Sequence, residues 1–148
     1  MIDKILVPLD GSDTAFKALT LACELADKHN TELLLLHVVP SHELPDSVRR
    51  FAEIERIDGP PELVYTKIVA KNVLIEGTEQ AQSKGVQSIQ QYVEYGDPAK
   101  TIVELANREN VNMIVMGTRG VSDITGLVFG SVAHKVNHLA SCTVASIK

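Results

Sequence analysis

The chain has no tryptophan and few other aromatic residues, with three tyrosines and three phenylalanines among its 148 residues. A buried core must therefore be built from aliphatic side chains, and apolar residues do make up 45% of the composition. A chain of this length can bury such a core in one domain. We therefore expect a single domain over residues 1–148.

An excess of positive charge is also missing, because 14 Lys and Arg residues face 19 Asp and Glu residues, a net charge of −5. Such a chain has no general attraction for nucleic acid or anionic lipid. No stretch approaches the roughly 20 apolar residues of a membrane helix. The first residues lack the basic and apolar regions of an export signal, and two cysteines make no disulfide framework. These absences predict a soluble, cytoplasmic protein that binds neither nucleic acid nor membrane.

Short apolar segments alternate with helical patterns along the chain. Five segments are typical of strands: 4–9, 31–39, 86–95, 111–116 and 142–147. Helices are predicted between them, the first ending near residues 29–30, the second running over 62–84 and the last over 132–139. Residues 40–61 interrupt this rhythm with four prolines and a weak helical pattern, and we treat them as a variable insert.

Helix start and stop signals support these boundaries. Ser12 is a suitable N-cap for the first helix, and Gly85 is the expected stop after the second. Asp97 followed by Pro98 combines an N-cap with proline at the first helical position.

Strands that alternate with helices predict an α/β fold, an open parallel sheet with helices on both faces. In such a sheet ligands bind beyond the carboxyl ends of the strands, where the winding reverses direction. If the strand order is 3-2-1-4-5, this switch point lies between the first and fourth strands. Asp10 follows the first of these strands and Gly117 the other.

The segment GTRGVSDITGLVFGS, residues 117–131, contains four of the nine glycines. A glycine-rich loop that leads into a helix exposes backbone N–H groups where the helix dipole favours an anion. The missing Cβ atoms of Gly117, Gly120 and Gly130 would let a phosphate approach, and Ser131 would add a hydroxyl donor and cap the helix. The alternative is an ordinary loop capped by Ser131, and the segment alone favours phosphate only slightly.

Other sites fit less well. No Gly-Lys-Ser/Thr occurs, which excludes a Walker P-loop, and only Gly11 follows the first strand, where a dinucleotide fingerprint needs three glycines. A receiver domain needs an Asp after the third strand, where Tyr95 and Gly96 stand. His134 and His138 have metal-ligand spacing without a third ligand, so we expect no metal site.

The spacing Gly117-x2-Gly120-x9-Gly130-Ser131-Val132 resembles the nucleotide-binding motif of the universal stress protein family. The likeness extends to ILVPLDGS (5–12), LLLLHVV (33–39) and IVMGTRG (114–120). The resemblance implies a Rossmann-like, five-stranded parallel sheet of the adenine nucleotide alpha hydrolase type, with strand order 3-2-1-4-5. It also implies ATP as the ligand, with AMP or ADP as alternatives and a role for Mg²⁺ left open.

The resemblance assigns roles to eleven residues. Asp10 would hydrogen-bond the ribose or the adenine side, and the Val38 backbone would contact the adenine edge. The others expected at the nucleoside are Pro8, Met116 and Gly117. Those expected around the phosphates are Gly120, Gly130, Ser131 and Val132, with Thr118 and Arg119 in the loop between.

The function implied is that of a nucleotide-binding stress-response or signalling module with an unidentified protein partner. In dimeric members the last strand pairs across the two-fold axis, although Thr143 here replaces the usual proline and Ser146 is less apolar than expected. The alternative is an enzyme: a slow ATPase, a self-phosphorylating protein or a nucleotidyl transferase. Since no lysine stands at a phosphate-binding turn, we expect any hydrolysis to be slower than roughly 1 s⁻¹.

Overall fold

The computed structural model describes residues 1–28, 30–40, 50, 54, 64, 66–119 and 130–148. Its strands are β1 (Lys4–Pro8), β2 (Glu32–Val39), β3 (Ser88–Tyr95), β4 (Met113–Gly117) and β5 (Thr143–Ile147). Its helices are α1 (Asp13–Leu25), α4 (Lys71–Ser83), α5 (Pro98–Arg108) and α6 (Ser131–Leu139), and a π-helical turn, η1 (Thr66–Ala70), precedes α4. The short helix considered within residues 40–61 lies almost wholly outside the described residues and stays a prediction.

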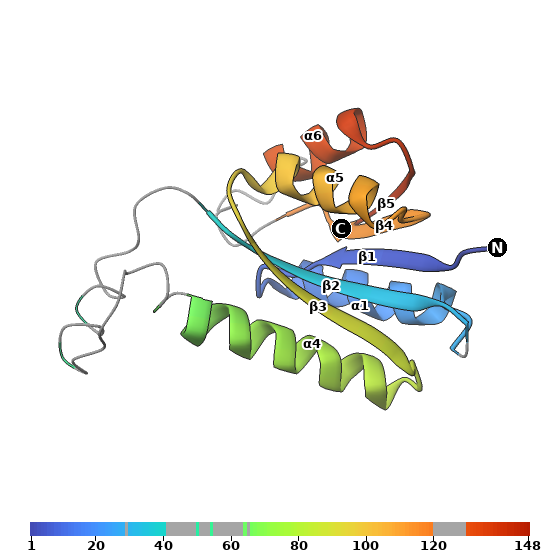
Figure 1. Ribbon diagram of the computed structural model, residues 1–148, viewed down its shortest axis with the longest axis horizontal. Helices are drawn as coiled ribbons and strands as arrows, with labels where there is room; N and C mark the ends of the chain where they lie inside the picture. The colour runs from blue at the N-terminus through green and yellow to red at the C-terminus, as the bar shows by residue number, and fades with distance from the viewer. Residues whose placement is uncertain (29, 41–49, 51–53, 55–63, 65, 120–129) are drawn as a thin grey trace.

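The five strands form one parallel sheet in the order β3-β2-β1-β4-β5, as predicted. Helices α1 and α4 cover one face of the sheet, and α5 and α6 cover the other (Figure 1). The winding reverses between β1 and β4, because β1 pairs with β2 on one side and with β4 on the other. The switch point therefore lies between β1 and β4, as predicted.

The core consists of two aliphatic layers, one on each face of the sheet. Along β1, Ile5 and Val7 face α1 and α4, whereas Leu6 faces α5 and α6. All three are fully buried, which explains why the central strands are apolar throughout instead of alternating with polar residues. No described helix is long and apolar enough to cross a membrane.

Three predicted helix boundaries are confirmed, two by capping hydrogen bonds and one by a backbone angle. The Ser12 hydroxyl accepts from the Ala15 N–H, and the Asp97 carboxylate accepts from the Lys100 N–H. Gly85 follows the end of α4 at a φ of +89°, a left-handed conformation that favours glycine.

Helix α1 ends at Leu25, earlier than the predicted position near residues 29–30. The chain turns at Asp27, whose carbonyl accepts from the Thr31 N–H at 2.7 Å. The Thr31 hydroxyl in turn accepts from the Asp27 N–H at 3.0 Å and donates to the Ile2 carbonyl at 2.8 Å. These hydrogen bonds form in place of a further turn of helix α1. They also connect the residue before β2 to the start of the chain.

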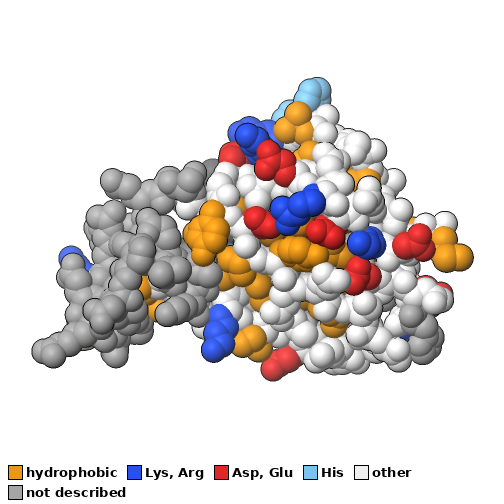
Figure 2. All heavy atoms as spheres, in the orientation of Figure 1, with side chains coloured by type: hydrophobic (Ala, Val, Ile, Leu, Met, Phe, Trp, Pro, Cys, Tyr) orange, Lys and Arg blue, Asp and Glu red, His pale blue; other side chains and the backbone are white. Residues whose placement is uncertain are grey.

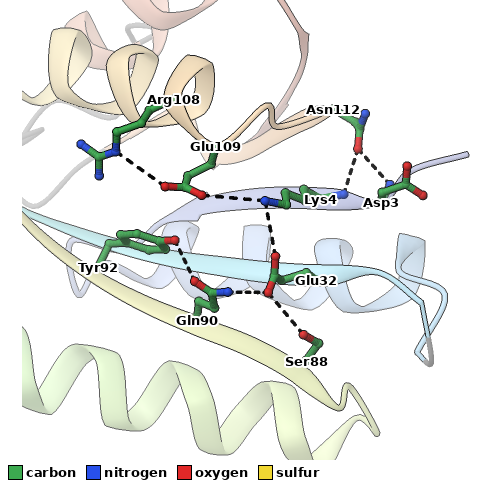
Figure 3. Close-up of polar contacts among 9 residues, drawn as sticks. All are labelled: Asp3, Lys4, Glu32, Ser88, Gln90, Tyr92, Arg108, Glu109 and Asn112. Carbon is green, nitrogen blue, oxygen red and sulfur yellow. Dashed lines mark hydrogen bonds and ion pairs between the residues drawn. The ribbon is translucent and has the colours of Figure 1, made fainter.

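A polar surface covers the sheet beside α5 (Figure 3). The Lys4 ammonium lies 3.7 Å from the Glu32 carboxylate and 3.8 Å from that of Glu109. Gln90 donates to the same Glu32 carboxylate at 2.6 Å. Figure 2 shows acidic and basic side chains intermingled on this face instead of separated by sign. Each of these charges has a partner of opposite sign within the protein, and we assign no ligand to them.

Candidate functional site

The pairing of β1 with β4 ends before the pairing of β1 with β2. The β1–β2 register continues to Pro8 opposite Leu36, whereas the β1–β4 register contains only Ile5 and Leu6. The Leu9 N–H donates to the Leu36 carbonyl on the β2 side, so the nitrogen of Pro8 faces β4. Proline has no N–H to donate there, which allows β1 and β4 to separate at the switch point.

Asp10 lies at this point, in the turn that joins β1 to α1. Its Oδ1 accepts from the Ser12 backbone N–H at 2.9 Å and from the Ser12 hydroxyl at 2.6 Å. Gly11, between them, has a φ of +89°, which favours glycine. The turn holds an exposed carboxylate at the carboxyl end of β1, the position predicted for nucleoside contact.

His37 lies beneath this turn and is only 2% exposed. Its Nδ1 is 2.8 Å from the carbonyl oxygen of Leu9, and because a carbonyl can only accept, Nδ1 carries the proton. Burial lowers the pKa of His37 and outweighs the opposing effects of the Leu9 hydrogen bond and the nearby Asp10 carboxylate. The ring is therefore neutral at pH 7.

Val38 presents its backbone to the same region. The Leu36 carbonyl faces β1, and the Val39 carbonyl accepts from the Gly96 N–H on the β3 side. Since alternate peptide groups of a strand point to opposite sides, those of Val38 face β1, beyond the last β1 residue in register. This orientation is the one that backbone contacts with a ligand at the switch point require.

The end of β4 lies against the start of α1. A Cβ at Gly117 would lie 2.7 Å from Oγ1 and 2.9 Å from Cβ of Thr14. The Thr14 hydroxyl donates to the Arg119 carbonyl at 2.7 Å. Two segments more than one hundred positions apart in the sequence are thus joined at the switch point.

The two described ends of the 117–131 segment also meet. The Gly130 N–H donates to the Thr118 carbonyl at 2.6 Å, and a Cβ at Gly130 would collide with that carbonyl oxygen. Protein atoms therefore occupy the positions of the missing Cβ atoms at Gly117 and Gly130. The glycine pattern predicts an approaching phosphate at these positions, whereas in the structure the close neighbours are Thr14 and Thr118 of the protein itself.

Helix α6 begins at Ser131, with Gly130 as its N-cap. This corrects the expectation that Ser131 caps the helix. Because glycine has no side chain, no side-chain acceptor from the N-cap satisfies the first N–H groups of α6. The exposed Ser131 lies in this first turn, where the dipole favours negative charge.

The remaining predicted site residues have different environments. Met116 and Thr118 are 5% exposed, Val132 is half-buried against the core beneath α5 and α6, and Arg119 is exposed. Gly120 lies outside the described residues. The sequence indicates only a capping role for Ser12 and no role for Thr14, because no local pattern shows that α1 begins beside β4.

No group of three or more His, Cys, Asp or Glu side chains in the described part of the chain could hold a metal ion. Cys23 is buried in the core, and Cys142 is half-buried. Burial raises the pKa of both thiols. Neither is therefore activated as a nucleophile at neutral pH.

Comparisons with known proteins agree with this fold. The model of the universal stress protein family matches residues 1–148. Universal stress protein YxiE of Bacillus subtilis is 33% identical, with all of both chains covered. The universal stress protein UspA of Lactobacillus plantarum superposes with a TM-score of 0.79 at 26% identity, covering 99% of this chain and 98% of that one. A universal stress protein of Archaeoglobus fulgidus, solved in complex with dAMP, has the same fold at 21% identity, with a TM-score of 0.70 and coverage of 100% and 98%.

Proposed function

Because the chain belongs to the universal stress protein family, we propose that it is a cytoplasmic module that binds ATP between the carboxyl ends of β1 and β4. One observation carries the proposal. The Asp10 turn and the segment that begins at Gly117 meet at the switch point, joined by the hydrogen bond from Thr14 to Arg119. A protein of the same fold holds dAMP, so an adenine nucleotide is a ligand class that this fold accommodates.

The nucleoside would lie on the β1–β2 side. The exposed Asp10 carboxylate accepts hydrogen bonds, as ribose hydroxyls or an adenine amino group require. The Val38 peptide groups, which face past the end of β1, would contact the adenine edge, while Pro8, Met116 and Gly117 would border the nucleoside.

The phosphates would lie at the start of α6. Gly130 leaves the first N–H groups of this helix without a side-chain cap, and Ser131 adds a hydroxyl. We place Val132, Thr118 and Arg119 at the same end. Gly120 is included in this proposal only because of its place in the family motif.

ADP and AMP would make the same nucleoside contacts as ATP but fewer of the phosphate contacts. A bound Mg²⁺ would neutralise part of the phosphate charge.

We further propose a homodimer through β5, which lies at an edge of the sheet. Pairing of two β5 strands would satisfy the outward-facing backbone groups of both edges. Ser146 does not disturb this arrangement, because Asn137 of α6 donates to its hydroxyl at 3.0 Å. The bound nucleotide would then bias the shape or partner choice of the dimer in a stress response.

Two measurements test the proposed function. Mass spectrometry of small molecules released by heating the purified protein should detect an adenine nucleotide. Calorimetric titration of nucleotide-free protein should show binding of ATP, and GTP serves as the control for the base. A folded protein that releases no nucleotide and binds no ATP would refute the proposal.

A further inference from the structure

We infer that Thr14 is a positioning residue for the phosphate end of the site, an inference that rests on the proposed nucleotide function. Thr14 belongs to the first turn of α1 and has no position in the family motif described above. Its hydroxyl donates to the Arg119 carbonyl at 2.7 Å, and its side chain occupies the space beside Gly117. Thr14 therefore contacts both the last residue of β4 and the segment that follows it.

The single proton of each hydroxyl determines which of these contacts are hydrogen bonds. Ser12 and Thr14 have their hydroxyl oxygens 3.3 Å apart. The proton of Ser12 is donated to Asp10 at 2.6 Å, and that of Thr14 to Arg119. No proton is therefore left for a hydrogen bond between the two hydroxyls. The Thr14 hydroxyl donates to the Arg119 carbonyl, and the Ser12 hydroxyl donates to the Asp10 carboxylate.

The bond to Arg119 matters because of the direction of a carbonyl dipole. A backbone segment that binds an anion must turn its N–H groups toward the anion and its carbonyl oxygens away. The Thr118 carbonyl is turned to the Gly130 N–H, and the Arg119 carbonyl is turned to the Thr14 hydroxyl. Two consecutive carbonyl oxygens are thus held by protein donors. Without the Thr14 hydroxyl, the Arg119 oxygen can rotate toward a phosphate and repel it.

The test replaces the hydroxyl while retaining the shape. Thr14→Val removes the donor but keeps two branches on Cβ, and Thr14→Ser keeps the donor. We expect Thr14→Val to weaken ATP binding about 2- to 12-fold, the equivalent of one neutral hydrogen bond, and to leave adenosine binding unchanged. Thr14→Ser should bind ATP like the wild type. Thr20→Val is the matched control, because Thr20 donates to the Phe16 carbonyl within the same helix.

A second measurement needs no nucleotide. The Gly130 N–H is bonded to Thr118, next to the residue that Thr14 holds, so its hydrogen exchange reports on this segment. Exchange at Gly130 should be faster in Thr14→Val than in the wild type, Thr14→Ser and Thr20→Val.

Each outcome is decisive. Unchanged ATP affinity with unchanged exchange in folded Thr14→Val would overturn the positioning role. If Thr14→Val weakened ATP and adenosine binding equally, the effect of Thr14 would not be restricted to the phosphate end of the site. If the wild type binds no adenine nucleotide, the proposed function fails instead, and exchange at Gly130 alone decides whether Thr14 positions the segment.

Discussion

The Nδ1 of His37 donates a hydrogen bond to the carbonyl of Leu9 across 2.8 Å, in a position where the imidazole is 2% exposed. This bond holds the last residue before Asp10, so a buried group of β2 supports the turn that carries the exposed carboxylate. The bond requires a proton on Nδ1, which the neutral ring supplies.

We predict that His37 makes stability dependent on pH. Burial lowers its pKa from the usual 6.5, so the unfolded chain binds the proton more readily than the folded chain. The stabilisation is fully present above about pH 6.5 and is lost as the pH falls toward the lower pKa of the folded state. The amide of His37→Asn can still donate a hydrogen bond but does not titrate. As the pH is lowered from 7.5 to 5.5, the free energy of unfolding of this variant should therefore fall less than that of the wild type. Urea unfolding at both pH values measures the difference, and identical losses in the two proteins would contradict the prediction.

A second prediction concerns Gly77, where α4 crosses the end of β1. A Cβ at Gly77 would lie 2.5 Å from Cδ1 of the buried Leu9. Gly77→Ala should therefore destabilise the protein by about 0–2 kcal/mol, because overpacking costs about 1–3 kcal/mol and the gain in helix propensity is about 1 kcal/mol.

The sign should reverse when Leu9 is shortened. Leu9→Ala alone should cost about 2–5 kcal/mol. In the Leu9→Ala protein, Gly77→Ala still gains helix propensity and fills part of the cavity that Leu9→Ala leaves. It should therefore increase the free energy of unfolding. Urea unfolding of the wild type, the two single variants and the double variant measures both effects of Gly77→Ala. Equal effects of Gly77→Ala in both backgrounds would show that Leu9 is not the obstacle.

A third prediction separates the two ends of the nucleotide site. Ser131→Ala removes a donor to a charged phosphate, a bond worth about 1.5–3 kcal/mol, so ATP should bind about 10–150-fold more weakly while adenosine is little affected. Asp10→Ala should weaken ATP and adenosine by similar factors, since the lost contact belongs to the part they share. Calorimetric titration of both variants with both ligands is the measurement. Unchanged ATP affinity in folded Ser131→Ala would remove Ser131 from the site.

A fourth prediction concerns the dimer. The Ile147 carbonyl accepts from Thr118 beside β4, so the peptide groups of Val144, three positions earlier, face outward. Val144→Pro removes an outward N–H and should convert the dimer to a monomer in light scattering, with the circular dichroism preserved. Val144→Ala loses similar packing but retains the N–H, and should stay dimeric. A folded Val144→Pro dimer would place the interface elsewhere, and a monomeric wild type would end the dimer proposal.

Much of the fold could be predicted from local signals. Apolar runs marked the five strands, and Ser12, Gly85 and Asp97 marked helix boundaries, because a cap acts on N–H or carbonyl groups only a few residues away. The resemblance to a family implies the strand order, and that order places Asp10 and Gly117 at one switch point, as the structure confirms.

Tertiary structure decided what the sequence could not specify. The early end of α1 depends on Thr31 reaching the Ile2 carbonyl, and the need for glycine at position 117 depends on Thr14. Thr14 and Arg119, 105 positions apart, meet only because β1 and β4 are neighbours in the sheet. No periodicity records such a contact, since hydrophobic pattern determines which face of an element is buried but not which atoms of a distant segment lie against it.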